Sequence, residues 1–203
     1  MRESKRELFP LVKSTTTPRF DASRTLSTSA WEAAYLRFET PEEEIRKFVR
    51  RLRKLGADQW PRDAEILELF CGRGNGLHAL ERLGFGRVEG VDLSSTLLAH
   101  YQGPARTHLG DCRHLPFPER CKDVVIVHGG LHHLSNLPDD LDQTFMEMQR
   151  VLRENGRVMF VEPWLTPFLK LVHWIAAKHL MRRCSVKLDA FQTMFEHERR
   201  TYE

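Results

Sequence analysis

The chain has 203 residues, and its 31 Lys and Arg nearly balance its 28 Asp and Glu, for a formal net charge of +3. This length suits one domain with a sizeable core, and so small a charge gives no argument for a nucleic-acid partner. The opening MRESKRELFP lacks the apolar core of a secretory signal, and no apolar run reaches the ~20 residues of a membrane span. Four scattered cysteines without a C-x-x-C pair favour reduced thiols and a cytoplasmic location.

The N-terminal part divides into a polar stretch and a helical one. Residues 1–30 are rich in Ser and Thr and are expected to be loosely ordered. Residues 31–60 predict two helices, of which the first places three aromatic side chains on one face. That face either packs into the core or closes over a site as a lid, because both roles need an apolar stripe. The three side chains are Trp31, Tyr35 and Phe38.

The second of these helices carries its own start and stop signals. Thr40 as N-cap, Pro41 at the first helical position and Glu43 three residues after the cap form a capping-box pattern. Gly56 is typical of the residue that follows a helix.

From residue 65 the pattern changes to short apolar segments that alternate with helices. Such alternation predicts right-handed βαβ units and an α/β fold, with a mostly parallel sheet covered by helices on both faces. Residues 61–163 are expected to form this core. The predicted strands are 65–71, 87–93, 105–109, 122–128 and 157–163, and the predicted helices are 76–83, 95–101 and 139–154.

A glycine-rich loop follows the first predicted strand, in the stretch EILELFCGRGNGLHAL. Ligands of open α/β sheets lie at the carboxyl ends of the strands. Gly72, Gly74 and Gly76 are therefore expected to let a ligand approach the backbone with no Cβ in the way. On this view a Gly74→Val substitution would abolish ligand binding and leave the fold largely intact.

Acidic residues at strand ends indicate an adenosine site. Asp92 ends the second strand twenty residues after Gly72, where a carboxylate can accept both ribose hydroxyls. Asp111 follows the third strand and could receive an amino group from a base. Glu68 is either an ordinary strand residue or a carboxylate beneath a cationic cofactor. Leu77 stands where a dinucleotide fingerprint needs Gly or Ala, which argues against a nicotinamide cofactor.

Five segments in order resemble the motifs of class I S-adenosylmethionine-dependent methyltransferases of the small-molecule type. They are LELFCGRGNG, VEGVDLS, GDCRHLPF, DVVIVHGGLHHL and RVLRENGRVMFVEP, and the resemblance covers residues ~60–163. It implies S-adenosylmethionine as cofactor, a Rossmann-like sheet and methyl transfer. By this resemblance the methionine part lies against Gly72 and Gly74, the ribose against Asp92, the adenine against Asp111 and Cys112, and the sulfonium near His128 and Gly129. Glu68, Gly76 and Leu93 are also expected to bind the cofactor.

The acceptor is less well defined, because methyl transfer is an in-line displacement in which geometry does most of the work. The pocket is expected from residues 28–40, 128–137 and 162–185, around a small-molecule acceptor with an O or N acceptor atom, of lipid or sugar type among others. His132 or His133 could act as a general base, or both could simply pack at the start of a loop. Glu162 could hydrogen-bond an acceptor or cap the following segment. The histidines show no metal-site spacing with Cys or acidic residues, so no metal is expected.

The C-terminal part, residues 164–203, predicts a helical lid or substrate segment that includes Trp164. Contact of residues 164–183 with a membrane surface is the alternative. Residues 186–203 read as one amphipathic helix, whereas the family sheet usually continues into a hairpin. The fifth strand would then be an uncovered edge. Either the chain is a shortened or fragmentary member, or another chain, including a second copy, covers that edge.

Three rival functions stay open at this point. A non-catalytic or partner-dependent module that binds S-adenosylmethionine would share the whole motif set. A nicotinamide-dependent oxidoreductase would share the adenosine site but not Leu77. A nucleic-acid methyltransferase would need a base-methylation motif after the fourth strand, and none of the N-P-P-Y type is found.

Overall fold

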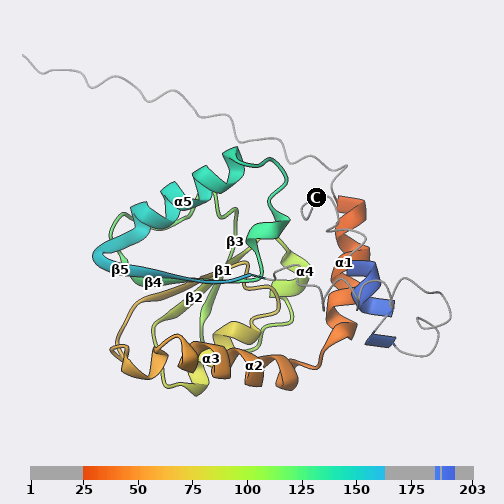
Figure 1. Cartoon of the computed structure of the whole chain (residues 1–203), viewed down its shortest axis with the longest axis horizontal. Coiled ribbons are helices and arrows are strands. Elements are labelled where there is room, and N and C mark those ends of the chain that lie inside the picture. Colours follow the sequence, from red (N-terminus) through yellow and green to blue (C-terminus); the bar gives the residue numbers. More distant parts are fainter. Residues whose placement is uncertain (1–24, 163–185, 188, 195–203) are drawn as a thin grey trace, which may run out of the picture.

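The computed structural model describes residues 25–162, 186–187 and 189–194. Within these residues, five parallel strands form one sheet in the order β3-β2-β1-β4-β5, seen from its edge in Figure 1. The chain crosses from β3 back to β4 beside β1, which creates the switch point where such sheets bind ligands. The predicted α/β fold is thus confirmed. The strands are β1 Ile66–Leu69, β2 Val88–Asp92, β3 Arg106–Leu109, β4 Lys122–His128 and β5 Leu152–Val161.

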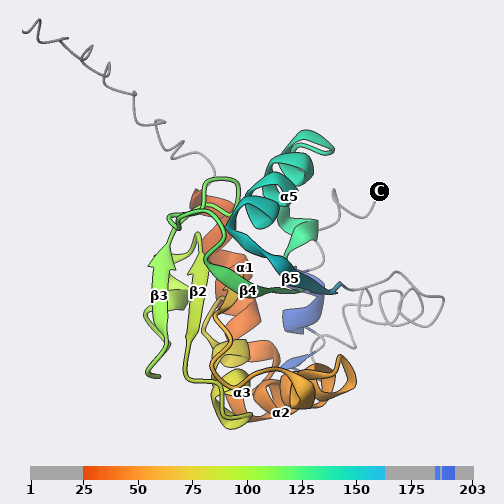
Figure 2. The ribbon, with the colours of Figure 1, turned by 90° about the vertical axis from the view of Figure 1, so that its left-hand side faces the viewer.

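Helices cover both faces of the sheet because its central strands are apolar on both sides. The helices α2 (Pro41–Lys54) and α3 (Asn75–Arg82) pack on one face, and α5 (Asp139–Val151) packs on the other (Figures 1 and 2). Along β1 the side chains alternate between these layers, so Ile66 packs with the α2 and α3 side and Leu67 with the α5 side. Both are fully buried.

The helix α1 (Thr25–Phe38) lies outside these layers, beyond the carboxyl ends of the strands, next to residues 186–187 and 189–194 (Figure 1). Its buried Ala34 packs with Ala190 and Met194, and the Phe38 ring stacks on Phe191 at 5.8 Å between ring centroids. After α1, the predicted capping box starts α2, and a short helix α4 (Ser95–Leu98) follows β2.

Three helix boundaries differ by three residues or more from the sequence predictions. α1 begins at Thr25, so residues 25–30 are helical rather than loosely ordered. α4 ends at Leu98, short of the predicted 101. α5 ends at Val151, and residues 152–154 belong to β5, because Leu152 pairs with the first residue of β4 and draws the chain into the sheet.

The strand β5 forms one edge of the sheet and pairs within the described residues with β4 alone. Its Phe160 is 42% exposed and meets Phe145 of α5 edge-to-face. The predicted association through this edge stays a prediction, and light scattering tests it, since a monodisperse monomer would contradict it. None of the helices described is long and apolar enough to cross a bilayer. Trp164 and most of the predicted C-terminal lid lie outside the described residues.

Candidate active site

The glycine loop is tied to the neighbouring strand through Asp92. The Gly72 N–H donates to Asp92 Oδ2 at 2.8 Å, and the Ser94 N–H donates to Oδ1 at 2.8 Å. Gly72 has a φ of +52°, a conformation that favours glycine. Burial raises the pKa of the Asp92 carboxyl although these backbone donors oppose the shift, and nearby Glu32 adds to it. The predicted loop and ribose residues therefore meet at one point.

Two of the three predicted glycines make room for protein side chains. A Cβ on Gly74, whose φ is +78°, would lie 2.3 Å from Cδ2 of Tyr101. A Cβ on Gly76 would lie 1.9 Å from Oε1 of Glu68. The expectation that Gly74→Val leaves the fold intact is therefore wrong, because the new side chain would collide with a packed ring in a strained backbone conformation.

Glu68 and His128 form a buried pair on the face of the sheet that α2 and α3 cover. Glu68 Oε1 lies 3.3 Å from His128 Nδ1, both side chains are 3% exposed, and Phe48 stacks on the imidazole at 4.5 Å. Burial raises the pKa of Glu68 in spite of the histidine. Among the described residues, Glu68 Oε2 and His128 Nε2 have no hydrogen-bond partner. Sequence reasoning had placed both residues at the cofactor but not against each other.

Asp111 is held by an arginine that the sequence reasoning missed. Arg113 Nε lies 3.0 and 3.1 Å from the two carboxylate oxygens, and Nη1 reaches Asp140 at 2.6 Å. Burial alone would raise the pKa of Asp111, but the Arg113 contacts outweigh it and the pKa is lowered. The Cys112 side chain is buried near Thr144, pointing into the α5 layer. Leu93, also expected at the cofactor, is 51% exposed.

On the acceptor side, the structure brings two predicted catalytic residues together. Glu162 accepts hydrogen bonds from the backbone N–H groups of Gly130 (2.8 Å) and Leu131 (2.9 Å), and its other oxygen lies 2.9 Å from His132 Nδ1. Burial would raise the pKa of Glu162, but the hydrogen bonds, that of His132 first, lower it. The glutamate thus stays a carboxylate and orients the imidazole. Gly129, with a φ of +69°, leads into this turn.

Two of the three predicted lid residues on α1 reach the site. Trp31 meets the His133 ring edge-to-face at 4.9 Å and stacks on Tyr35 at 5.3 Å. The Tyr35 hydroxyl in turn lies over the glycine loop, 3.6 Å from where a Cβ on Gly72 would stand. Phe38 instead packs away from the site. α1 therefore covers the loop and touches the His132–His133 turn at the same time.

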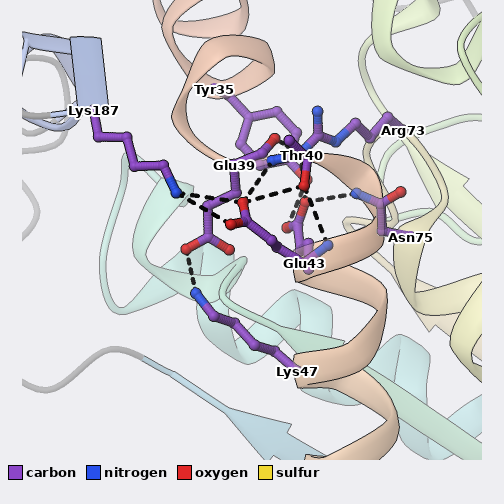
Figure 3. Close-up of polar contacts among 9 residues, drawn as sticks. Tyr35, Glu39, Thr40, Glu43, Lys47, Arg73, Asn75 and Lys187 are labelled. Atoms are coloured by element: carbon purple, nitrogen blue, oxygen red, sulfur yellow. Dashed lines mark hydrogen bonds and ion pairs between the residues drawn. The ribbon is translucent and has the colours of Figure 1, made fainter. Parts of the chain in front are cut away.

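Arg73, between two of the glycines, connects the loop to α1 and α2 (Figure 3). It is 5% exposed, pairs with Glu44 at 2.7 Å, donates to the Glu39 carbonyl at 2.8 Å and lies 4.8 Å from the Tyr35 ring centroid. Asn75 and the Tyr35 hydroxyl also bind Glu44, at 2.6 and 3.0 Å. The sequence signal was a lone arginine inside a glycine loop, which sequence reasoning did not use.

Residues 67–160 match the family model described as "Methyltransferase domain". This range thus forms a methyltransferase domain of the class I S-adenosylmethionine-dependent type. The matched range runs from β1 to β5 and contains the glycine loop and both strand-end aspartates.

Curated relatives of this methyltransferase chain carry quinone-related names. It is 30% identical over 128 residues to a demethylmenaquinone methyltransferase of Lactobacillus johnsonii, covering 58% of this chain and 48% of that one. It is 25% identical over 182 residues to a 2-phytyl-1,4-naphtoquinone methyltransferase of Synechococcus elongatus, covering 78% and 76%. The chain spans about half the length of the demethylmenaquinone methyltransferases it matches.

Solved structures agree on the fold. The PH0226 protein of Pyrococcus horikoshii OT3 superposes with a TM-score of 0.56 at 27% identity, over 64% of this chain and 59% of that one. A SAM-dependent methyltransferase from Archaeoglobus fulgidus gives a TM-score of 0.56 at 18% identity, over 75% and 63%, which is a likeness of fold alone.

The side chains at the site fit S-adenosylmethionine, the methyl donor of this family. The strand ends present Asp92 and Asp111, and α1 brings Glu32 next to them through its contact with Ser94, while the loop cation Arg73 is already bound to Glu44. Such a set suits a sulfonium, an ammonium and ribose hydroxyls. The negatively charged pyrophosphate of a dinucleotide would instead be repelled by these carboxylates. No cluster that could hold a metal ion occurs in the described part of the chain.

Proposed function

We propose that this chain transfers a methyl group from S-adenosylmethionine to a small hydroxylated aromatic acceptor of the naphthoquinol type. The observation that supports it best is the position of the His132–Glu162 pair. It lies at the same edge of the sheet as Gly72 and Asp92, and α1 touches both regions through Trp31 and Tyr35.

The cofactor would be held by residues of the first three strand ends. Asp92 would accept the ribose hydroxyls, and its carboxylate is already oriented by two backbone donors. Asp111 would receive the adenine amino group, with its charge fixed by Arg113. Gly72 would offer backbone to the methionine part. When bound, S-adenosylmethionine supplies an electrophilic methyl group, and Tyr35 and Trp31 on α1 would exclude water above it as a lid.

His132 would remove the proton of the acceptor. With its Nδ1 hydrogen donated to Glu162, the imidazole carries its lone pair on Nε2. A ring hydroxyl of the acceptor would give its proton to Nε2, which would make the ring electron-rich enough for a ring carbon to take up the methyl group. That carbon would afterwards lose its own hydrogen as a proton while the ring oxygen recovers one, so that the aromatic ring is restored. Glu162 then stabilises the imidazolium by its charge.

The relatives guide the choice of acceptor. Their names refer to demethylmenaquinone and 2-phytyl-1,4-naphtoquinone. An aromatic acceptor would also suit the face of Trp31, which is stacked on Tyr35 beside the His133 ring. We therefore favour a ring carbon over an O or N atom as the methyl acceptor.

Transfer of a labelled methyl group tests the proposal. We expect label in a reduced demethylnaphthoquinone and little in simple amines or sugars. His132→Gln should lower kcat about 10²-fold or more, as expected for a general base. The control His78→Gln removes a histidine of α3 that also pairs with a glutamate at 2.9 Å, and it should leave kcat unchanged.

Calorimetric titration with S-adenosylmethionine, S-adenosylhomocysteine and NAD separates the rival functions. Tight binding of the first two without transfer to any acceptor would indicate the non-catalytic module. Binding of NAD alone would contradict the proposed function outright.

A further inference from the structure

Phe70 adopts a backbone conformation that bulky residues avoid. It stands between β1 and the glycine loop with a φ of +56°. In the left-handed region a non-glycine residue is strained, and the surrounding structure must hold it there. Such strain is found most often where a site needs a particular geometry, so the question is what the Phe70 ring touches.

The ring packs directly against the loop that follows β4. A Cβ built on Gly130 would lie 2.2 Å from Phe70 Cγ and 2.3 Å from Cδ2. The backbone of Gly130 therefore rests on the ring with no room for a side chain. The φ of Gly130 is −129°, so the glycine is needed here for space and not for its backbone freedom.

Gly130 in turn begins the turn that holds the proposed base. The N–H groups of Gly130 and Leu131 bind Glu162 Oε1, and Glu162 Oε2 binds His132. The His133 N–H closes the turn onto the Gly130 carbonyl at 3.0 Å. A continuous series of contacts thus runs from the Phe70 ring through Gly130 and Glu162 to His132.

We propose that Phe70 is a positioning residue of the methyltransferase: from its strained conformation, its ring sets the place of Gly130 and so of the His132–Glu162 pair relative to the cofactor loop. Phe70 is two residues before Gly72, so one short segment carries both the cofactor cradle and the support of the base. The inference rests on the proposed role of His132.

The test compares Phe70→Leu and Gly130→Ala with a control, Phe117→Leu. Phe117, like Phe70, is partly buried and packs against the core on the α5 side of the sheet, so its truncation measures the general effect of losing a ring. Thermal melts show that each variant is folded. Calorimetry gives the cofactor Kd, labelled transfer gives kcat and KM, and an NMR titration follows the His132 ring, assigned with His132→Gln.

For both test variants we expect kcat to fall about tenfold or more, with the cofactor Kd changed less than about twofold. Glu162 and His133 both face the His132 ring. Losing the carboxylate contact should move the His132 titration to lower pH, because Glu162 favours the imidazolium. The double variant should be no worse than the poorer single one, since both act on one contact. Phe117→Leu should change none of these quantities.

Two results would overturn the inference. One is a folded Phe70→Leu or Gly130→Ala variant whose His132 titration and kcat match those of the parent. The other is an equal loss of cofactor affinity and kcat, which would assign the ring to the glycine loop alone. A fully active His132→Gln variant would contradict the proposed role of His132 as the base. Because the NMR titration needs no substrate, it shows independently of that result whether Phe70 sets the position of the His132 ring.

Discussion

The two sides of the site are built in different ways. The cofactor side uses backbone groups and strand-end carboxylates, as in the contact of the Gly72 N–H with Asp92. The acceptor side depends on side chains from distant segments, such as Trp31 on His133 and Glu162 on His132. Backbone groups at strand ends are placed by the sheet itself, whereas the acceptor side is placed by packing. We therefore expect the contact of Gly72 with Asp92 to survive loss of the Trp31 ring, whereas the His132–His133 turn would be disturbed by it.

The largest effect is expected at Arg73, because its side chain joins the glycine loop of the cofactor side to α1 on the acceptor side. Arg73→Met should lower the free energy of unfolding by about 3 kcal/mol, since it leaves the partly buried Glu44 without its cation. Arg87→Met is the control, because the Arg87–Glu65 pair is largely exposed on its arginine side and should cost less than about 1 kcal/mol. Urea denaturation of both variants measures the difference. Equal losses would show that Arg73 does not hold α1 on the loop.

The glycine loop tests whether the cofactor side is shaped by protein packing. Gly74→Ala and Gly84→Ala place a Cβ at φ values of +78° and +86°, but only the first meets another residue. Each should cost about 1 kcal/mol through backbone strain, and Gly74→Ala about 1–3 kcal/mol more through the clash with Tyr101. Urea midpoints give both values. Matching midpoints would mean that the Tyr101 ring moves aside freely.

The role of a strand-end carboxylate in cofactor binding can be tested at Asp92. Asp92→Ala should weaken S-adenosylmethionine binding by about 1.4 kcal/mol or more, roughly tenfold, because charge-assisted hydrogen bonds to the ribose are lost. Asp123→Ala is the control, since that carboxylate also accepts a backbone N–H, at 2.8 Å, but at the opposite end of the sheet. Calorimetric titration gives both affinities. Unchanged affinity in Asp92→Ala would remove the ribose assignment.

The smallest expected effect is that the two sides of the site lose their carboxylate charge at different pH. The pKa of Asp92 is raised and that of Glu162 is lowered. As the pH falls, Asp92 is protonated first and cofactor binding should weaken while Glu162 is still ionised. The contribution of Glu162 to stability is present above its unfolded pKa and is lost only when the pH falls through its lowered folded pKa. Cofactor titrations and melts between about pH 6 and pH 3 measure the order, and loss of binding only below the Glu162 transition would contradict it.

The sequence by itself was sufficient for the sheet and the cofactor. Apolar periodicity and the capping box of α2 are local properties of the sequence. The spacing from Gly72 to Asp92 lies within one βαβ unit, so it too can be recognised from the sequence. The end of α5 could not be predicted, because pairing of Leu152 with β4 overrides local helix preference.

Only the tertiary structure decided what the side chains at this edge touch. Gly74 and Gly76 are the clearest case, since their spacing indicated ligand space while Tyr101 and Glu68 occupy it. The same holds for Phe70 against Gly130, which are sixty residues apart in the chain, and for Arg73 against Glu44. These contacts depend on rotamers and on packing between separate elements, and neither leaves a periodic or local signal in the sequence.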